Sequence, residues 1–139
     1  MQNPLPHHPN LDCWLYASHC ALPSAWAPKA VEDIVAKSIQ RNASLEVTGA
    51  LLFNGTRFVQ FLEGPANGVA AIRQSILADS RHRNVTTFMT EQQSCRIFSN
   101  WSLAYAGPSV FISDKIENMV RNIPSASSEI IDMLRSFVF

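Results

Sequence analysis

The sequence has no surplus of charge of either sign and no long hydrophobic run. Eleven basic residues balance eleven acidic residues, so the formal net charge is zero, whereas a nucleic-acid-binding domain usually carries a basic stripe. No apolar run reaches the roughly 18–20 residues that a membrane-spanning helix needs. We therefore expect neither nucleic acid nor a membrane as a partner. An apolar fraction of 47% in 139 residues is instead typical of one compact domain.

Glycine and cysteine are also scarce, and their spacing excludes several kinds of site. The five glycines are scattered and form no phosphate-binding loop. The three cysteines are odd in number and lack zinc-site spacing, which predicts reduced thiols in a cytoplasmic protein. We find no nucleophile paired with a base, no paired carboxylates and no metal cluster. We therefore predict that the protein is not an enzyme and binds no metal.

Apolar spacing and turn residues predict seven elements between residues 11 and 106. The predicted strands are 11–18, 48–53, 57–62, 85–90 and 101–106. The first predicted helix begins at Pro28 and ends near Asn42, and its apolar face carries Val31, Ile34, Val35, Ser38 and Ile39. The second opens after Gly64-Pro65 and buries Val69, Ile72 and Ile76. The pair Asn54-Gly55 predicts a tight hairpin between the second and third strands, and residues 92–96 are predicted to be a loop.

This order, β-α-β-β-α-β-β, predicts an α+β ferredoxin-like sandwich. We expect a mixed five-stranded sheet with two helices on one face, followed by two short C-terminal helices. Residues 1–10 lack the apolar segment of a signal peptide and are predicted to be a flexible lead, 11–108 the domain, and 109–139 a helical extension. Ser113 caps the first extra helix, and the second spans about Ser127 to Phe137. We expect the extension to pack on the open face of the sheet.

Four polar residues occupy positions that otherwise have the pattern of a core. Tyr16 lies in the middle of the first strand, and Gln60 interrupts an apolar strand. Ser38 and Asn42 lie on or beside the inward face of the first helix. If these groups face one gap between sheet and helices, they need partners there, and a ligand with apolar faces and polar edges would supply them. Taken from the pattern alone, an outward Gln60 and an Asn42 that only caps its helix fit equally well.

Around these residues the sequence resembles the BLUF family of flavin-binding blue-light sensors. The resemblance extends from about Leu11 to Ala106 and rests on five segments in the same order and spacing as in the family. These segments are 15–18 (LYAS), 38–52 with Ser38-Ile39-Gln40-Arg41-Asn42 and Val47-Thr48-Gly49-Ala50-Leu51-Leu52, 57–64 (RFVQFLEG), 79–84 (DSRHRN) and 100–102 (NWS).

The resemblance implies non-covalently bound FAD and assigns roles to particular residues. Tyr16, Gln60 and Trp101 would be the photoactive group, and Ile34 and Ile76 would clasp the two faces of the flavin. Asn42 would bind the C4 carbonyl edge, Ser38 would lie in the same pocket, and Asp79, Arg81 and His82 would line the outer polar edge. Light would move an electron and a proton from Tyr16 to the flavin, after which Gln60 would rotate or tautomerise and the absorption would shift slightly to the red.

The sequence departs from the family pattern at three places. Leu103 stands where many members have a methionine that would relay the signal, Arg41 stands where a second asparagine is common, and Glu46 replaces a small residue. The expected output is a separate, unidentified partner protein, and whether the chain forms a homo-oligomer is left open. The alternative is a ligand-free ferredoxin-like protein-interaction module. A small acyl-phosphate hydrolase would need an arginine-bearing loop early in the chain, and none is present.

Overall fold

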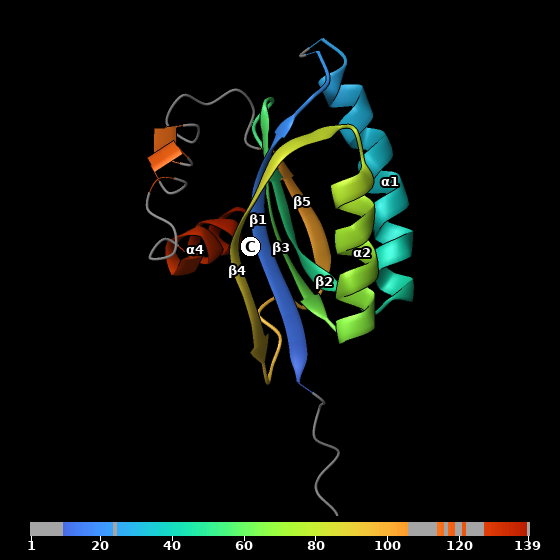
Figure 1. Ribbon diagram of the computed structural model, residues 1–139, viewed down its shortest axis with the longest axis vertical. Coiled ribbons are helices and arrows are strands. Elements are labelled where there is room, and N and C mark those ends of the chain that lie inside the picture. Colours follow the sequence, from blue (N-terminus) through green and yellow to red (C-terminus); the bar gives the residue numbers. More distant parts are fainter. Residues whose placement is uncertain are drawn as a thin grey trace, which may run out of the picture.

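The computed structural model describes residues 10–23, 25–105, 114–115, 117–118, 121 and 127–138, and Figure 1 shows how its elements are arranged. The strands are β1 (Leu11–Cys20), β2 (Thr48–Phe53), β3 (Arg57–Gly64), β4 (His82–Gln93) and β5 (Trp101–Tyr105). The helices are α1 (Ala27–Ser44), α2 (Ala66–Ala78) and α4 (Ser127–Val138). None of the helices in these residues is long and apolar enough to cross a membrane.

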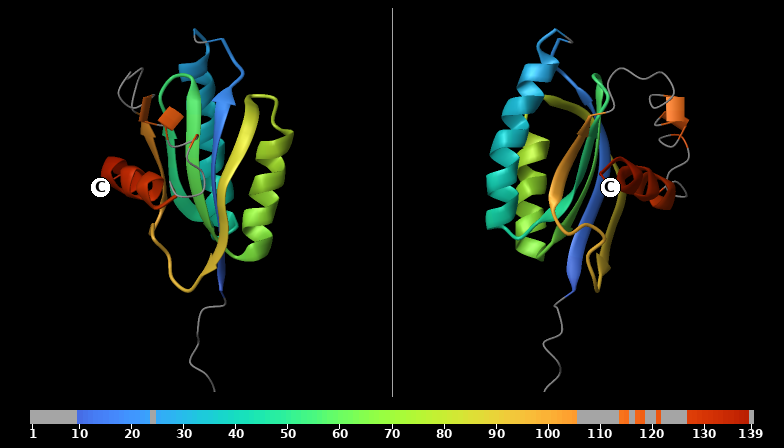
Figure 2. Two further views of the ribbon diagram at one scale, coloured as in Figure 1. Left: turned by 60° about the vertical axis from the view of Figure 1, so that its left-hand side comes forward. Right: turned by 180° about the vertical axis from the view of Figure 1, so that it is seen from behind.

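The strands form one sheet in the order β4-β1-β3-β2-β5. Strand β1 pairs antiparallel with both β3 and β4, β2 pairs antiparallel with β3, and β5 runs parallel to β2. Helices α1 and α2 lie side by side on one face of the sheet, and α4 lies on the other (Figure 2). The α+β class predicted from the sequence is therefore confirmed, and the first six elements have the β-α-β-β-α-β order of ferredoxin-like folds.

Two glycines explain the register of the central hairpin. Gly55 has φ +103°, the left-handed backbone that the turn between β2 and β3 requires, and the Asn54 side chain accepts hydrogen bonds from the backbone N–H groups of Thr56 and Arg57. At Gly49 (φ +150°) an added Cβ atom would lie 1.8 Å from the carbonyl oxygen of Phe61. Strand β2 can therefore approach β3 at this point only because residue 49 has no side chain.

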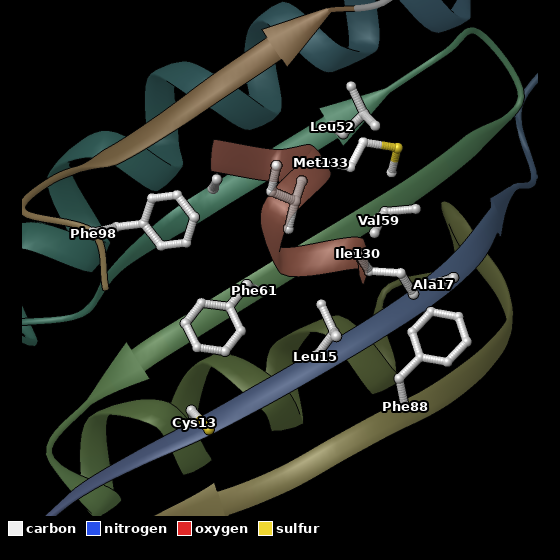
Figure 3. Packing of buried hydrophobic residues seen from close by; sticks show 12 residues of the cluster. Cys13, Leu15, Ala17, Leu52, Val59, Phe61, Phe88, Phe98, Ile130 and Met133 are labelled. Carbon is white, nitrogen blue, oxygen red and sulfur yellow. The ribbon is translucent and has the colours of Figure 1, made fainter. Parts of the chain in front are cut away.

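A cluster of buried hydrophobic residues forms the core between α4 and the sheet (Figure 3). From α4 it receives Ile130, Met133 and Leu134, and from the strands it receives residues such as Leu15 and Phe61. Leu15, Phe61 and Leu134 are each 0% exposed. The prediction that the end of the chain packs on the face opposite the two helices is thus confirmed for α4. The helix predicted to begin at Ser113 lies largely outside the described residues, as does the side chain of Phe137.

Some predicted boundaries and faces were wrong. Ile39 was expected on the buried face of α1 but is 54% exposed, whereas Asn42 is 3% exposed. With 3.6 residues per turn, Asn42 lies only about 20° around the helix from Val31, while Ile39 lies about 80° away. Helix α1 also continues past Asn42 to Ser44. Residues 92 and 93 belong to β4 rather than to a loop, because β4 pairs with β1 as far as Leu11 and Gln93.

Candidate functional site

A cavity of about 180 Å³ lies between the sheet and the two helices α1 and α2. Helix α1 contributes one wall, α2 and the segment after it contribute another, and β3 and β5 form the floor. All of the residues predicted to bind the cofactor line this cavity, as does Trp101, whereas Tyr16 does not: the lining includes Ile34, Ser38, Asn42, Gln60, Ile76, Asp79, Arg81, His82 and Trp101. The fold therefore brings together residues that are up to 67 positions apart in the chain, from Ile34 to Trp101.

A chain of hydrogen bonds joins the three predicted photoactive residues at the floor of the cavity. The Gln60 Nε2 group donates to the Tyr16 hydroxyl at 2.6 Å. The Trp101 indole Nε1–H donates to Gln60 Oε1 at 2.9 Å. Tyr16 and Gln60 are direct partners in the β1–β3 register, so strand pairing itself places their side chains next to each other on the helix-facing side. Gln60 thus faces the cavity, and the alternative of an outward Gln60 is excluded.

Tyr16 lies directly behind Gln60 and is completely buried. Its ring stacks on Trp14, with ring centroids 4.3 Å apart and an interplanar angle of 22°. Burial raises the pKa of the Tyr16 hydroxyl far above its ordinary value, and the hydrogen bond from Gln60 offsets only part of that effect. The phenol therefore holds its proton near neutral pH.

The polar wall of the cavity is formed by Asp79, Arg81 and His82. The Arg81 guanidinium pairs with the Asp79 carboxylate at 2.7 Å, which lowers the pKa of Asp79 and raises that of Arg81. The His82 Nδ1 atom lies 2.7 Å from the hydroxyl of the buried Ser18. Burial lowers the pKa of His82, so its imidazole is neutral near pH 7. This wall therefore offers one fixed ion pair and one neutral imidazole.

Asn42 and Ser38 supply the donor and acceptor groups of the α1 wall. Asn42 is 3% exposed, and Asn42 and Ser38 both line the cavity. A molecule that fills the cavity can form hydrogen bonds with the polar groups on this wall. The half-buried Ile34 and Ile76 flank the cavity from opposite helices. These features fit a flat ring with apolar faces and polar edges, as in a flavin.

The sequence did not identify every residue of this region. Arg41, noted only as a departure from the family, bridges the helices: its guanidinium donates to the Ser75 hydroxyl at 2.6 Å and to the Ala71 carbonyl at 3.4 Å. Lys37 and Ser75 also line the cavity. Ser75 precedes the apolar Ile76 without any distinctive motif, so only the packing of α2 against α1 reveals its position. The side chain of Leu103 lies outside the described residues, although its backbone pairs with Leu51.

Together the sheet, the two helices and this cavity define a small α+β ligand-binding domain. Over residues 11–104 the chain matches the BLUF family, described as sensors of blue-light using FAD. Because the match covers most of the chain, this chain belongs to the BLUF family.

Individual relatives agree with this assignment. The chain is 40% identical over 70 residues to the blue light- and temperature-regulated antirepressor BluF of Escherichia coli (strain K12), covering 50% of this chain and 17% of the antirepressor. It is 31% identical over 105 residues to the photoactivated adenylate cyclase subunit beta of Euglena gracilis, covering 75% of this chain and 11% of that subunit. The dark-state structure of the BLUF protein BlrB is similar at a TM-score of 0.74 and 29% identity, covering 88% of this chain and 93% of that one. The chain spans less than a fifth of the length of either curated relative.

The burial of Tyr16 leads to a prediction about its titration. An exposed tyrosine loses its proton near pH 10, whereas the raised pKa of Tyr16 should keep its hydroxyl protonated well above that pH while the protein stays folded. Because the unfolded chain releases this proton first, the contribution of Tyr16 to folding stability should fall as the pH rises through about 10. The measurement is a pH titration of the Cζ resonance in protein labelled with ¹³C-tyrosine, with the Tyr16 signal assigned from its absence in Tyr16→Phe. A midpoint near that of free tyrosine would contradict the buried environment described here.

Proposed function

We propose that the cavity between α1 and α2 holds the flavin ring of FAD, with Tyr16, Gln60 and Trp101 acting as the photoactive group. The observation that carries this proposal is the hydrogen-bond chain from Tyr16 through Gln60 to Trp101, which ends at the cavity floor. Ile34 and Ile76 would contact the faces of the ring. The polar edges would be bound by Ser38, Asn42, Asp79, Arg81 and His82.

Bound FAD would supply the absorption of blue light and the capacity to accept an electron and a proton. The chain's own contribution begins with the Tyr16 hydroxyl, which holds a proton in a dry environment beside Gln60. The Trp101 indole can only donate, so it fixes Gln60 Oε1 toward Trp101 and Nε2 toward Tyr16. This orientation would be the dark arrangement.

Rotation of the Gln60 amide by half a turn would produce a second arrangement. The Gln60 Oε1 atom would then accept a hydrogen bond from the Tyr16 hydroxyl, while the Nε2 group would oppose the indole N–H of Trp101, and that bond would be lost. The two arrangements differ by about one hydrogen bond, which is worth a net 0.5–1.5 kcal/mol, or up to about tenfold in population. Such a switch can shift an element that is already nearly balanced between two states.

FAD binding is tested first, together with the role of Asn42. Denaturing the purified protein should release about one FAD per chain, since the cavity has room for a single ring system. Asn42→Ala should weaken FAD affinity by up to about tenfold, because it removes one buried hydrogen-bonding group. The measurement is a fluorescence titration of the flavin-free protein with FAD. Asn67→Ala, an exposed position on α2, is the matched control and should bind as the parent does. A protein that takes up no FAD would end this proposal.

The photoactive group is tested with three variants. Tyr16→Phe removes the hydroxyl and Gln60→Leu removes both hydrogen-bonding functions, so each should bind FAD but lose the light-induced red shift. Trp101→Phe removes only the indole donor and should keep the shift while changing the rate of dark recovery by up to roughly tenfold. The measurement is a difference spectrum before and after blue light, followed through recovery. Gln74→Leu, at an exposed position on α2, should behave as the parent does. A Gln60→Leu variant that still shifts would show that Gln60 is not the switch.

The output of the switch is proposed to be the α4 face of the sheet and a separate partner protein. The E. coli relative is named as an antirepressor, and a sensor that regulates another protein in this way needs no catalytic site of its own. Helix α4 packs on the face opposite the cavity, so a change in the strands reaches it through the sheet. Leu103, two residues after Trp101 in β5, would take part in this relay. The free thiols of Cys13, Cys20 and Cys95 favour a cytoplasmic location.

Hydrogen exchange in darkness and under blue light tests this output. Light should raise amide exchange in α4 by several-fold, because rearrangement of the sheet would weaken the packing of Ile130 and Leu134. The Gln60→Leu variant under the same illumination shows whether any change depends on the switch. Identical protection of α4 in both states would contradict the proposed route.

A further inference from the structure

Glu63 is a buried carboxylate that the photoactive group does not use. It is 0% exposed and lies near the end of β3, three residues after Gln60. Because side chains alternate along a strand, Glu63 faces the side of the sheet opposite Gln60. A fully buried carboxylate persists only where hydrogen bonds compensate for its lost hydration. The hydrogen-bond donors around the Glu63 carboxylate are therefore the groups that stabilise it.

The partners of Glu63 belong mainly to the segment that connects β4 to β5. Glu63 Oε2 accepts from the backbone N–H of Phe98 at 2.6 Å, and the backbone N–H of Ile97 lies 2.8 Å from Oε1 and 3.0 Å from Oε2. The Gln93 side-chain amide also donates to Oε1, and the Thr48 hydroxyl lies 3.5 Å from Oε2. Burial raises the pKa of Glu63, and these donors act in the opposite direction by stabilising the charged form. Both carboxylate oxygens are therefore engaged.

Arg96 lies in the same segment and binds the start of β2 and the end of β3. Its guanidinium donates to the Thr48 hydroxyl at 2.7 Å, to the Glu63 carbonyl at 3.2 Å and to the Glu46 carbonyl at 2.8 Å. Glu46 has φ 58°, in the left-handed region that a non-glycine residue seldom adopts, and this conformation precedes β2. The connection is thus fixed from the inside by Glu63 and from the outside by Arg96.

The same short connection touches both faces of the sheet. Phe98 is 2% exposed and packs against Phe61 at a ring-centroid distance of 5.8 Å, within the cluster that also holds α4 (Figure 3). Two residues later the Asn100 carbonyl accepts from the backbone N–H of Gly49 at 3.1 Å. Trp101 then begins β5 and donates its indole N–H to Gln60 on the cavity side. Only two residues separate Phe98, on the α4 side, from Trp101, on the cavity side.

We propose that Glu63 is a positioning residue: its carboxylate binds the backbone of Ile97 and Phe98, fixes where β5 begins, and thereby holds the Trp101 indole against Gln60. The same contact couples Trp101 to Phe98 and so links the cavity to the α4 face. A change in the hydrogen bonding of Gln60 that displaces Trp101 also displaces the segment between β4 and β5. Phe98 in that segment is packed in the core on the α4 side. This role rests on the proposed function of Gln60 and Trp101.

Glu63→Gln is the variant that tests this proposal. The amide keeps one oxygen but places an NH₂ group where the second carboxylate oxygen accepted hydrogen bonds, so at least one backbone N–H of Ile97 or Phe98 faces a donor. Shape is almost unchanged, and the cavity is not touched. Glu91→Gln, an exposed position on β4, removes the same charge away from the connection and is the matched control.

The primary readout is hydrogen exchange of the Trp101 indole N–H in the FAD-loaded protein in darkness, followed by NMR and assigned from its absence in Trp101→Phe. Glu63→Gln should raise this exchange rate at least about fivefold, because loss of the anchoring bonds frees the start of β5. It should also change the dark-recovery rate in the same sense as Trp101→Phe, while the FAD content and the red shift are kept. Glu91→Gln should match the parent in all four measurements.

The outcomes separate this proposal from the function on which it rests. If the parent protein shows no red shift, the proposed function fails, while the indole exchange still reports whether Glu63 holds Trp101. Parent-like indole exchange and recovery in Glu63→Gln would overturn the positioning role. Should Glu63→Gln fail to fold, Arg96→Gln loosens the same connection from its exposed side and should raise indole exchange in the same direction. Unchanged exchange in that variant would also overturn the proposal.

Discussion

The pair of hydrogen bonds made by the Gln60 side chain constrains the whole site. An amide has one accepting end and one donating end, and here the ends are assigned by two neighbours with different capacities: the Trp101 indole can only donate, and the Tyr16 hydroxyl accepts. Each neighbour comes from a different strand, so the orientation of one side chain depends on the relative placement of β1, β3 and β5. A buried amide with both ends engaged has few alternatives. It can change only by exchanging partners, which is the property that a switch requires.

The sheet separates two interiors of different character. The α4 side is an apolar cluster in which Leu15, Phe61 and Leu134 are inaccessible to solvent. The helix-facing side combines smaller apolar clusters with a cavity that contains the amides of Asn42 and Gln60. A close-packed core has low compressibility and transmits strain, and packed interfaces change between discrete arrangements. The connection that carries Phe98 and Trp101 passes from one interior to the other, and Glu63 is the group that fixes it.

The walls of the cavity also differ in their electrostatics. At one edge of the cavity the charges of Asp79 and Arg81 neutralise each other in an ion pair. Burial lowers the pKa of His82 and keeps its imidazole neutral beside the hydroxyl of Ser18. The Arg41 guanidinium donates to the Ser75 hydroxyl and to the Ala71 carbonyl, and these hydrogen bonds connect α1 to α2 next to the cavity. The family match covers most of the chain, yet Arg41 stands where a second asparagine is common in the family. Residues that depart from a family pattern can therefore acquire structural roles that the pattern does not describe.

Local features of the sequence determined most of the elements. Asn54-Gly55 requires a left-handed turn, Pro28 suits the first turn of a helix, and strand alternation placed Gln60 on the same side as Phe58 and Leu62. These signals depend on backbone preferences and on periodicity within one segment. They can therefore be recognised without knowing which other segments pack against that segment. The four polar residues at core positions were visible for the same reason, because an amide or hydroxyl in an apolar pattern is a local anomaly. Family resemblance then named the ligand that the anomaly suggested.

Only the tertiary structure decided which of these residues meet and what else joins them. Periodicity placed Ile39 on the buried face of α1, but the actual packing of that helix exposes it and buries Asn42. The length of β4 was decided by its pairing with β1, which no pattern within β4 specifies. The roles of Ser75 and Glu63 cannot be recognised from their own segments, because these roles arise from Arg41 and from the backbone of Ile97 and Phe98, each more than thirty positions away. A contact between distant segments is determined by the folded arrangement as a whole, and for that reason the sequence of either segment alone does not contain it.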